Sequence, residues 1–462
     1  LRPYSKDHSL KKPAMPSYVV QPVGTEQVKD IVGLANKEHI PLIPCSSRTH
    51  LYGTTIPNQG GVVVDLLRMN KIYPVDKANS AVRVEAGVTW GQLLPQLARE
   101  DYMTLTPLFP QAERSVVTSL LEREALVDCM YEYGEPLLTL EAVFPNGRVY
   151  RSGSASVKGV FEGAASAGVY PEGPGLDLFR LFQGAQGTMG IVTWAVVKTE
   201  YRPKVNKMFF ASFKNLEDAI QPLYRLERQT IGRECFLLNR VNLAALLAEK
   251  WPADYEALAR TLPAWTLVVV LSGGRRRPEE RVAYEEDALK EIGAEFRIDF
   301  ATSLPGAAGV ERKLMEMLRW PWPDGKPYWK QGMKGSFQDL FFITTLDKVN
   351  TFAGIMTALA PRHSYSLDKL GCYLQPLERG RACHLEFNLY HSPEDMEDRE
   401  RIRRLYGEAA QAMLKEGALY TRPYGELAPM VYGRAAAYAT VLKKIKKWLD
   451  PNNIMAPGNL CF

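Results

Sequence analysis

A glycine-rich turn between a helix pattern and a strand pattern constrains this chain more than any other stretch. Residues 176–197 read LDLFRLFQGAQGTMGIVTWAVV; the apolar spacing before the turn predicts a helix, and the β-branched run after it predicts a strand. Gly184, Gly187 and Gly190 have no side chains that would keep other atoms away from the backbone. The turn therefore allows close approach of a flat or anionic ligand, although a tight connection without a ligand fits the same residues.

Length and composition indicate a globular protein large enough for two packed domains. The chain has 462 residues, of which 46% are apolar and 24% charged. Its net charge of +5 is a weak field over this length and gives no reason to expect nucleic acid binding. No apolar run is long enough to cross a bilayer, and the N-terminus lacks the apolar core of a signal peptide, so we expect a cytoplasmic protein. The six cysteines contain no CxxC pair, so we predict no disulfide framework and no metal site.

The order of predicted helices and strands changes at Pro203 and divides the chain in two. Before Pro203, a helix that we expect Thr25 to cap alternates with strands at 40–44 and 62–66, and residues 140–153 form a strand, an Asn-Gly turn and a second strand. After Pro203, strand patterns are separated by charged helices, which predicts a second sheet with helices on one face. The predicted fold class is therefore α+β. We predict a domain at 1–203, a second domain at 204–417 and a C-terminal segment at 418–462.

The C-terminal segment contains an amphipathic helix pattern. We expect one side of this helix to be apolar and packed, with Tyr438, Val441, Leu442, Ile445, Trp448 and Leu449 on it. We expect the other side to be a solvated face rather than a docking patch, with Lys443, Lys444, Lys446 and Lys447 on it.

Five motifs in a fixed order identify a family resemblance. The motifs are the xPxxPxxxxTxLxG loop at 40–53, VxVEAGVTWGQL at 82–93, the YG…LEAVFPNGRV hairpin, DLFRLFQGAQGTMGIVT at 177–193 and KKWLDPNNIMAPG at 446–458. Together they resemble the flavin-binding oxidoreductases of the vanillyl-alcohol oxidase / p-cresol methylhydroxylase superfamily, which includes catalytic subunits of glycolate and D-lactate dehydrogenases. The resemblance implies a PCMH-type FAD-binding domain of two α+β halves, completed by the returning C-terminal segment. It also implies an α+β cap domain with an antiparallel sheet above the flavin ring.

The resemblance places the flavin pyrophosphate in the loop at 45–53, where the sequence departs from the family pattern. Ser46, Ser47 and Arg48 stand where relatives usually have glycines, and Thr118 follows Val117 where a Gly-Gly pair is common. Hydroxyl and guanidinium groups can still donate to phosphate, so we expect FAD to bind.

Some family members attach FAD covalently through a histidine of this loop. Thr49 occupies that place and His50 follows one residue late, so we expect non-covalent FAD. The resemblance then implies these cofactor-binding residues: Ser46, Ser47, Arg48, Thr49, His50, Gly53, Pro107, Thr118, Gly184, Gly187, Thr188, Gly190, Ile191, Val192 and Asn453.

A strand pattern at 382–391, ACHLEFNLYH, supplies candidates for catalysis. By its period of two, His384, Glu386, Asn388 and Tyr390 share one face. If that face looks toward the flavin, His384 or Glu386 is a candidate base for a substrate hydroxyl. A solvated polar sheet face is the alternative.

Two aromatic segments could complete a pocket. Arg422, in LYTRPYGELAPMVY, could grip a substrate carboxylate or stabilise a phenolate, whereas an aromatic turn packed on the core is the alternative. The segment WPWPDGKPYWK at 320–330 fits either a lid or a rigidly packed loop.

The resemblance implies an FAD-dependent dehydrogenase of a small hydroxylated substrate, and a 2-hydroxy acid such as glycolate or D-lactate is favoured. With no cysteine cluster in the chain, electrons would pass to a separate protein such as an iron–sulfur subunit or an electron-transfer flavoprotein. Oxidation of a para-substituted phenol is an alternative. A non-catalytic subunit with a degenerate flavin site is another, because of the lost glycines. Whether the chain forms a homo- or hetero-oligomer is left open.

Overall fold

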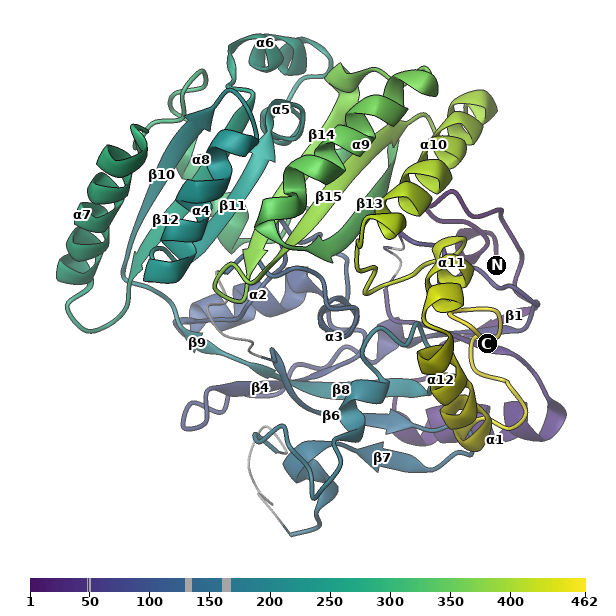
Figure 1. Ribbon diagram of the computed structural model, residues 1–462. Coiled ribbons are helices and arrows are strands. Elements are labelled where there is room, and N and C mark those ends of the chain that lie inside the picture. The colour runs from purple at the N-terminus through teal and green to yellow at the C-terminus, as the bar shows by residue number, and fades with distance from the viewer. Residues whose placement is uncertain (48, 50, 129–134, 160–167) are drawn as a thin grey trace.

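The computed structural model describes residues 1–47, 49, 51–128, 135–159 and 168–462. One large sheet with helices packed on it forms the upper part of Figure 1, and two smaller sheets lie below it. The fold is α+β, as predicted.

The first part of the chain contains the two smaller sheets. A parallel sheet has the order β1 (Tyr18–Val20), β3 (Val62–Asp65), β2 (Leu42–Cys45), and α1 (Thr25–Glu38) connects β1 to β2. An antiparallel sheet has the order β4 (Ala81–Glu85), β8 (Ile191–Lys198), β6 (Leu137–Val143), β7 (Val149–Arg151). Helices α2 (Trp90–Arg99) and α3 (Val116–Leu121) and the short pair β5 (Tyr102–Met103) and β9 (Glu200–Tyr201) complete this part. The predicted Asn-Gly hairpin is confirmed as β6 and β7.

The large sheet is antiparallel throughout. Its order is β10 (Val205–Phe213), β12 (Trp265–Gly273), β11 (Glu234–Asn239), β14 (Leu370–Leu377), β15 (Ala382–His391), β13 (Ser336–Thr344). All of these strands fall within the predicted second domain; the exact boundaries at 203 and 417 stay a prediction, which limited proteolysis would test. Strand β11 was not predicted.

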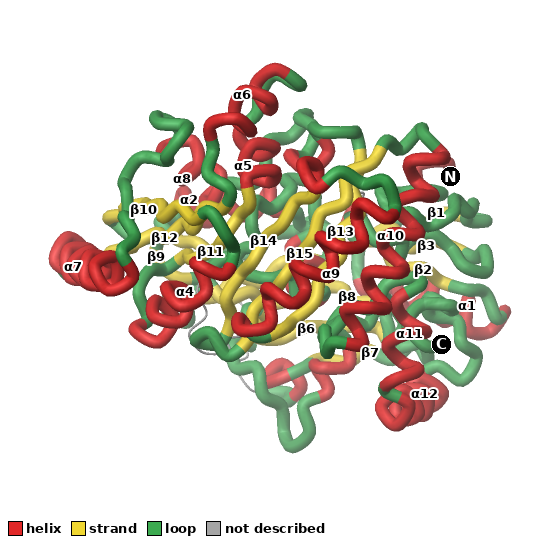
Figure 2. Tube along the Cα trace, turned by 45° about the horizontal axis from the view of Figure 1, so that its top comes forward, coloured by secondary structure: helices red, strands yellow, loops and turns green. Residues whose placement is uncertain are grey.

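Helices cover both faces of this sheet, not one face as predicted. On one face, α4 (Glu217–Gln229), α7 (Pro278–Phe296), α9 (Val349–Arg362) and α10 (Met396–Lys415) pack over a continuous apolar core. Figure 2 shows α9 and α10 lying across the strands. On the other face, α5 (Arg240–Leu247) and α8 (Glu311–Arg319) pack with β10, β11 and β12, while α6 (Ala253–Thr261) lies against α5. On the side of the sheet where α5 and α8 lie, strands β13, β14 and β15 face the first part of the chain (Figure 1).

The C-terminal segment returns to the first part, as the resemblance implied. After α11 (Leu427–Arg434) and α12 (Ala436–Leu449), the backbone N–H of Leu42 donates to the carbonyl of Ile454 at 2.7 Å. This bond ties the tail to β2, so the end of the chain lies beside the loop that follows β2.

Helix α12 differs from the prediction at four residues, namely Tyr438, Val441, Lys446 and Trp448. Tyr438, Val441 and Trp448 are 64%, 56% and 78% exposed, whereas Lys446 is buried. The Lys446 ammonium donates to Asp450 Oδ2 at 2.6 Å and to the carbonyls of Thr188 and Met455. Because these three acceptors satisfy the ammonium, its burial is stable. The rest of the prediction holds, since Leu449 is buried, Ile445 packs against the same core, and Lys443, Lys444 and Lys447 are exposed.

Two smaller predictions were also wrong. The helix expected before the glycine-rich turn is only a short 3-10 helix, Leu178–Leu181. Thr25 does not cap α1; the cap is Gly24, and the Thr25 hydroxyl donates to Glu141 on β6 at 2.7 Å. Among the described residues no helix is long and apolar enough to span a membrane.

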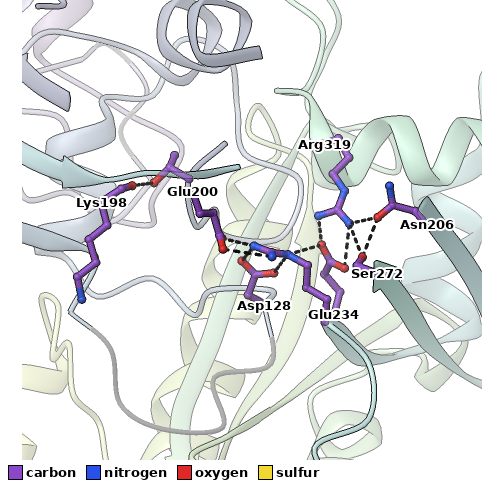
Figure 3. Close-up of polar contacts among 9 residues, drawn as sticks. Asp128, Lys198, Glu200, Asn206, Glu234, Ser272 and Arg319 are labelled. Atoms are coloured by element: carbon purple, nitrogen blue, oxygen red, sulfur yellow. Dashed lines mark hydrogen bonds and ion pairs between the residues drawn. The ribbon is translucent and has the colours of Figure 1, made fainter. Parts of the chain in front are cut away.

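A buried ion network joins the large sheet to the first part of the chain (Figure 3). Arg319 from α8 pairs with Glu234 on β11, and Arg233 pairs with Asp128 and with Glu200 on β9. Since Asp128 and Glu200 precede the large sheet in the sequence, this network fixes the junction of the two parts.

Candidate active site

A cleft lies between the loop after β2 and the glycine-rich turn before β8. It encloses about 930 Å³, part of it open to solvent. The predicted cofactor residues that line it are Ser46, Ser47, Thr49, Thr118, Gly187, Gly190 and Val192. The glycine-rich turn and the loop after β2 are far apart in sequence, and the fold brings them together at one cleft.

The groups in this cleft fit an anionic dinucleotide. The Thr49 hydroxyl is buried and has no hydrogen-bond partner in the described part of the chain. Gly187 has φ +76° and a Cβ there would lie 3.0 Å from Pro44 Cδ, while a Cβ on Gly190 would lie 2.7 Å from the Val143 carbonyl. The turn therefore packs directly on β2 and β6, and only glycine allows it to do so. Ser46 and Thr118 hydrogen-bond to each other through their hydroxyls, so two of the residues that replace the family's glycines are polar and face the cleft, whereas Val117 lines it with an apolar side chain.

Several predicted cofactor residues lie elsewhere. Thr188 donates its hydroxyl to the Ala185 carbonyl at 2.7 Å inside the turn, and Ile191 is buried in the core because strand alternation turns Val192, not Ile191, to the cleft. Gly184 packs beside Arg123, and Asn453 is exposed at the end of α12. Two further predicted residues line neighbouring cavities, namely Gly53 and Pro107. The predictions on Arg48 and His50 lie outside the described residues.

A second pocket adjoins the cleft, because Leu51, Tyr52 and Arg114 line both. Its floor is the inner face of the large sheet. The pocket-lining residues of that sheet are Phe337 and Asp339 on β13, Tyr373 on β14, and His384 and Glu386 on β15. Tyr328, Trp329 and Lys330 close it from one side, and Arg422 from another. The pocket therefore lies between the large sheet and the dinucleotide cleft.

A chain of buried hydrogen bonds supports the polar face of β15. His384 Nε2 lies 3.2 Å from Glu386 Oε2. The Lys330 ammonium donates to Glu386 Oε1 at 2.5 Å and to Asp339 Oδ2 at 2.9 Å, and the Asn388 amide donates to both carboxylates, at 2.7 and 2.5 Å. Behind Asn388, the side-chain amide of Asn242 donates to Asn388 Oδ1 at 2.6 Å. The Tyr390 hydroxyl donates to Asn242 Oδ1 at 2.7 Å. Every carboxylate and side-chain amide oxygen of this network accepts a hydrogen bond from the protein interior.

The surroundings shift the pKa values of His384, Glu386 and Asp339 in the pocket. Burial lowers the pKa of His384 below its ordinary value, although Glu386 opposes the shift, so the imidazole is neutral at neutral pH. Burial opposes ionisation of Glu386, but Lys330 and His384 outweigh it and lower the pKa of that carboxyl. Burial and the Glu386 charge raise the pKa of Asp339 to about 6. Neutral His384 beside ionised Glu386 is an arrangement that can accept a proton.

Arg422 is a buried cation with unpartnered donors. Its side chain is 3% exposed, and Nε and Nη1 have no hydrogen-bond partner among the described residues. Its guanidinium stacks on Phe341, 4.0 Å from the ring centroid, and Phe341 in turn stacks on His384 at 5.7 Å. The nearby carboxylates are engaged elsewhere, Glu122 with Tyr424 and Glu124 with Arg114. A buried guanidinium with free donors is a ready site for an anionic ligand group.

The predicted catalytic residues separate into two groups. His384, Glu386 and Arg422 line the pocket, whereas Asn388 and Tyr390 lie behind it and support the network. The alternative of a solvated sheet face is wrong, because all four residues on β15 are buried. Over the described ranges no cluster of three or more His, Cys, Asp or Glu side chains could hold a metal.

Sequence reasoning missed Lys330 and Asp339. Both were within reach, since Lys330 ends the aromatic segment at 320–330 and Asp339 is the charged residue in the apolar strand SFQDLFFIT. A charge within an apolar strand pattern is a signal of a buried partner. The aromatic segment at 320–330 forms part of the pocket wall, and its Trp329 and Tyr328 pack in the apolar core on this face of the large sheet.

Comparison with known proteins gives consistent results. Residues 16–153 match the FAD binding domain family FAD_binding_4. The chain is similar to the glycolate oxidase subunit GlcD of Bacillus subtilis, 30% identical over 47% of this chain and 44% of that protein. It is also similar to D-lactate dehydrogenase of Anaerostipes hadrus, 22% identical over 97% of this chain and 90% of that one. The structure of p-cresol methylhydroxylase with substrate bound covers 100% of this chain and 92% of that one with a TM-score of 0.83 and 22% identity, which shows the same fold.

Proposed function

We propose that this chain, which contains an FAD binding domain and is similar to FAD-linked oxidoreductases of the vanillyl-alcohol oxidase / p-cresol methylhydroxylase superfamily, oxidises a small 2-hydroxy acid. One observation carries this proposal. An unpaired guanidinium, Arg422, and a neutral imidazole, His384, line one pocket and stack on the same ring of Phe341. A 2-hydroxy acid has the two groups that match them, a carboxylate and a hydroxyl on the adjacent carbon.

The cofactor would occupy the adjoining cleft. Ser46, Ser47, Thr49 and the backbone of the turn at Gly187 would hold its pyrophosphate. When bound, FAD supplies the acceptor for the hydride that leaves the hydroxyl-bearing carbon.

The chain's own residues do the rest of the chemistry. Arg422 binds the carboxylate through two parallel N–H donors and so fixes the substrate's orientation. His384 takes the hydroxyl proton as the carbon–oxygen double bond forms. Aromatic side chains at Tyr328, Trp329 and Tyr373 keep water from the reacting atoms.

We also propose that the electrons leave to a separate protein, such as an iron–sulfur subunit or an electron-transfer flavoprotein. Three of the described cysteines, Cys235, Cys372 and Cys383, are buried and form no disulfide. Together with the lack of a described metal-binding cluster, this supports a next carrier on another chain.

A para-substituted phenol is the second candidate substrate, favoured by the aromatic walls. Tyr52 stacks on Tyr424 at 4.5 Å where the cleft and its neighbouring cavities meet, and Arg422 would then stabilise a phenolate. The pocket accommodates a ring as readily as an apolar substituent of a hydroxy acid.

The visible spectrum of the purified protein tests the proposal, followed by anaerobic additions of glycolate, D-lactate, L-lactate, p-cresol and 4-hydroxybenzyl alcohol. Bleaching of the flavin band by a hydroxy acid supports the first candidate, and bleaching by the phenols alone supports the second. A colourless protein that does not take up FAD would instead support a structural subunit with a degenerate site. Acid precipitation shows whether the flavin is covalently attached, because a non-covalent flavin leaves with the supernatant and a covalent one stays in the pellet.

A further inference from the structure

The hydrogen-bond network behind His384 distinguishes its two ring nitrogens. Nε2 faces Glu386 Oε2 at 3.2 Å, while Nδ1 has no hydrogen-bond partner in the described part of the chain. A carboxylate can only accept, so a neutral imidazole beside it must carry its proton on Nε2. Nδ1 is then an unprotonated acceptor on a ring that lines the pocket.

This tautomer depends on Glu386 being ionised in a buried position. Two carboxylates, Glu386 and Asp339, lie in the same dry cluster, and Lys330 is the described cation that contacts both. Without a cation between them, two buried carboxylates cannot both stay ionised, and a protonated Glu386 would donate to Nε2. The proton of the imidazole would then sit on Nδ1, the atom that must accept.

Lys330 holds its place for reasons found in its own surroundings. Its ammonium lies 5.4 Å from the ring centroid of Trp329 and 5.3 Å from that of Phe337. Both carboxylate partners lie on strands of the large sheet, Asp339 on β13 and Glu386 on β15. These contacts leave the ammonium one position, between the two carboxylates.

We propose that Lys330 is a positioning residue, whose ammonium keeps Glu386 ionised against Nε2 of His384 so that Nδ1 is the atom that takes the substrate's hydroxyl proton. In that step the O–H bond breaks and an Nδ1–H bond forms, while the hydride leaves the same substrate's carbon for FAD and a carbonyl remains. The assignment of Nδ1 as the base rests on the proposed function, but the tautomer and the role of Lys330 in setting it do not.

Nitrogen-15 NMR of the imidazole rings tests the tautomer without substrate or turnover. Protein labelled with ¹⁵N-histidine contains six histidines, and the His384→Gln variant identifies the signals of His384. At pH 7.5 in the FAD-loaded protein we expect a pyrrole-type Nε2 and a pyridine-type Nδ1. Observation of an Nδ1–H tautomer in the wild type would overturn the proposal.

Variants separate the charge of Lys330 from its bulk. Lys330→Met is expected to remove the single Nε2–H tautomer, and Lys330→Arg to restore it in part. Asp339→Asn is expected to keep it, because the contact from Lys330 to Glu386 remains.

Lys334→Met is the matched control, since Lys334 pairs with Asp398 outside the pocket at 3.0 Å and its loss leaves the network intact. If Lys330→Met does not fold, Glu386→Gln gives the same test, since a neutral amide no longer selects one tautomer. Retention of the wild-type tautomer in folded Lys330→Met contradicts the proposal.

The pH profile of flavin reduction provides the kinetic readout. In the wild type the rate of flavin reduction falls only as the pH drops through the pKa of His384, which burial lowers. The charged groups that face the His384 ring are Glu386, Lys330 and Arg422. In Lys330→Met we expect the acid limb to move to higher pH and the maximal rate to fall by about 10²-fold or more, whereas Lys334→Met keeps the wild-type profile. An unchanged acid limb in Lys330→Met contradicts the proposal. If no substrate reduces the flavin while NMR shows the Nε2–H tautomer, the proposed function fails and the tautomer assignment stands.

Discussion

Two ion clusters in this molecule, one buried and one partly buried, have similar components and different arrangements. The pocket cluster places one ammonium, Lys330, between two carboxylates, and the junction cluster places Arg233 and Arg319 among three. Each cluster thus holds one carboxylate more than it has cations. In the junction cluster Glu200 is 42% exposed, so water shares its charge, whereas both carboxylates of the pocket cluster are buried.

The difference shows in the central carboxylates. Lys330 lowers the pKa of Glu386, while burial raises the pKa of Glu234 to about 7 in spite of Arg319. The comparison teaches that buried charge alone does not mark an active site. The pocket cluster is distinguished because it faces a cavity and fixes a free imidazole nitrogen, whereas the junction cluster joins two parts of the chain.

The largest expected effect separates the clusters by activity. His384→Gln removes the proton acceptor, so we expect the rate of flavin reduction at saturating substrate to fall about 10²–10⁴-fold with folding and flavin content unchanged. His363→Gln is the control, because His363 pairs with Glu408 on the outer surface of α10. Stopped-flow absorbance measures both variants, and equal rates in His384→Gln and wild type would remove His384 from the mechanism.

The converse effect belongs to the junction. Arg319→Met leaves Glu234 buried without its strongest cation, so we expect the free energy of unfolding to fall by about 3–5 kcal/mol while the reduction rate per bound flavin stays near wild type. Arg312→Met, on the exposed side of the same helix, is expected to change stability by less than about 0.5 kcal/mol. Urea denaturation provides the comparison. A large rate loss in folded Arg319→Met would mean that the junction also shapes the active site.

A third prediction concerns substrate binding. Arg422→Met removes the unpaired guanidinium, so we expect KM for the substrate to rise about 10–100-fold, since a hydrogen bond to a charged group contributes about 1.5–3 kcal/mol. Stability is expected to hold or increase, because a buried cation without a partner is lost. Arg404→Met, exposed on α10, serves as the control. Steady-state kinetics with wild-type KM in Arg422→Met would exclude Arg422 as the anion site.

The smallest effect is a pH dependence of stability at the junction. The pKa of Glu234 is raised in the folded protein to about 7, so its contribution to stability is fully present below the ordinary glutamate pKa near 4.5 and is lost as the pH rises through 7. The groups that face it are Arg319, Arg233 and Asp128. We expect the free energy of unfolding to decline by about 1–3 kcal/mol from pH 4.5 to pH 7.5 relative to Glu234→Gln. If the difference in the free energy of unfolding between wild type and Glu234→Gln, measured by urea denaturation, is the same at every pH, this assignment is contradicted.

Sequence reasoning reached the pocket by periodicity and missed what supports it. Strand alternation placed His384 and Glu386 on one face, and two glycines of the predicted turn, Gly187 and Gly190, line the cleft; that they contact a ligand stays a prediction. Lys330 escaped because its partners come from strands that begin after it, and no local pattern encodes a contact between residues 330 and 386. Lys446 was also missed, because its helical spacing matches a solvated face and its acceptors become visible only in the fold: two come from the tail, at Asp450 and Met455, and one from Thr188 in the glycine-rich turn.

The most direct test of the account is anaerobic flavin reduction by a 2-hydroxy acid in three proteins measured side by side, namely wild type, His384→Gln and Arg319→Met. The account predicts that wild type and Arg319→Met bleach at similar rates per bound flavin, and that His384→Gln bleaches at least about 10²-fold more slowly. If the hydroxy acid bleaches none of them, or if the two variants slow equally, then the pocket beside the flavin cleft is not the catalytic centre that we describe.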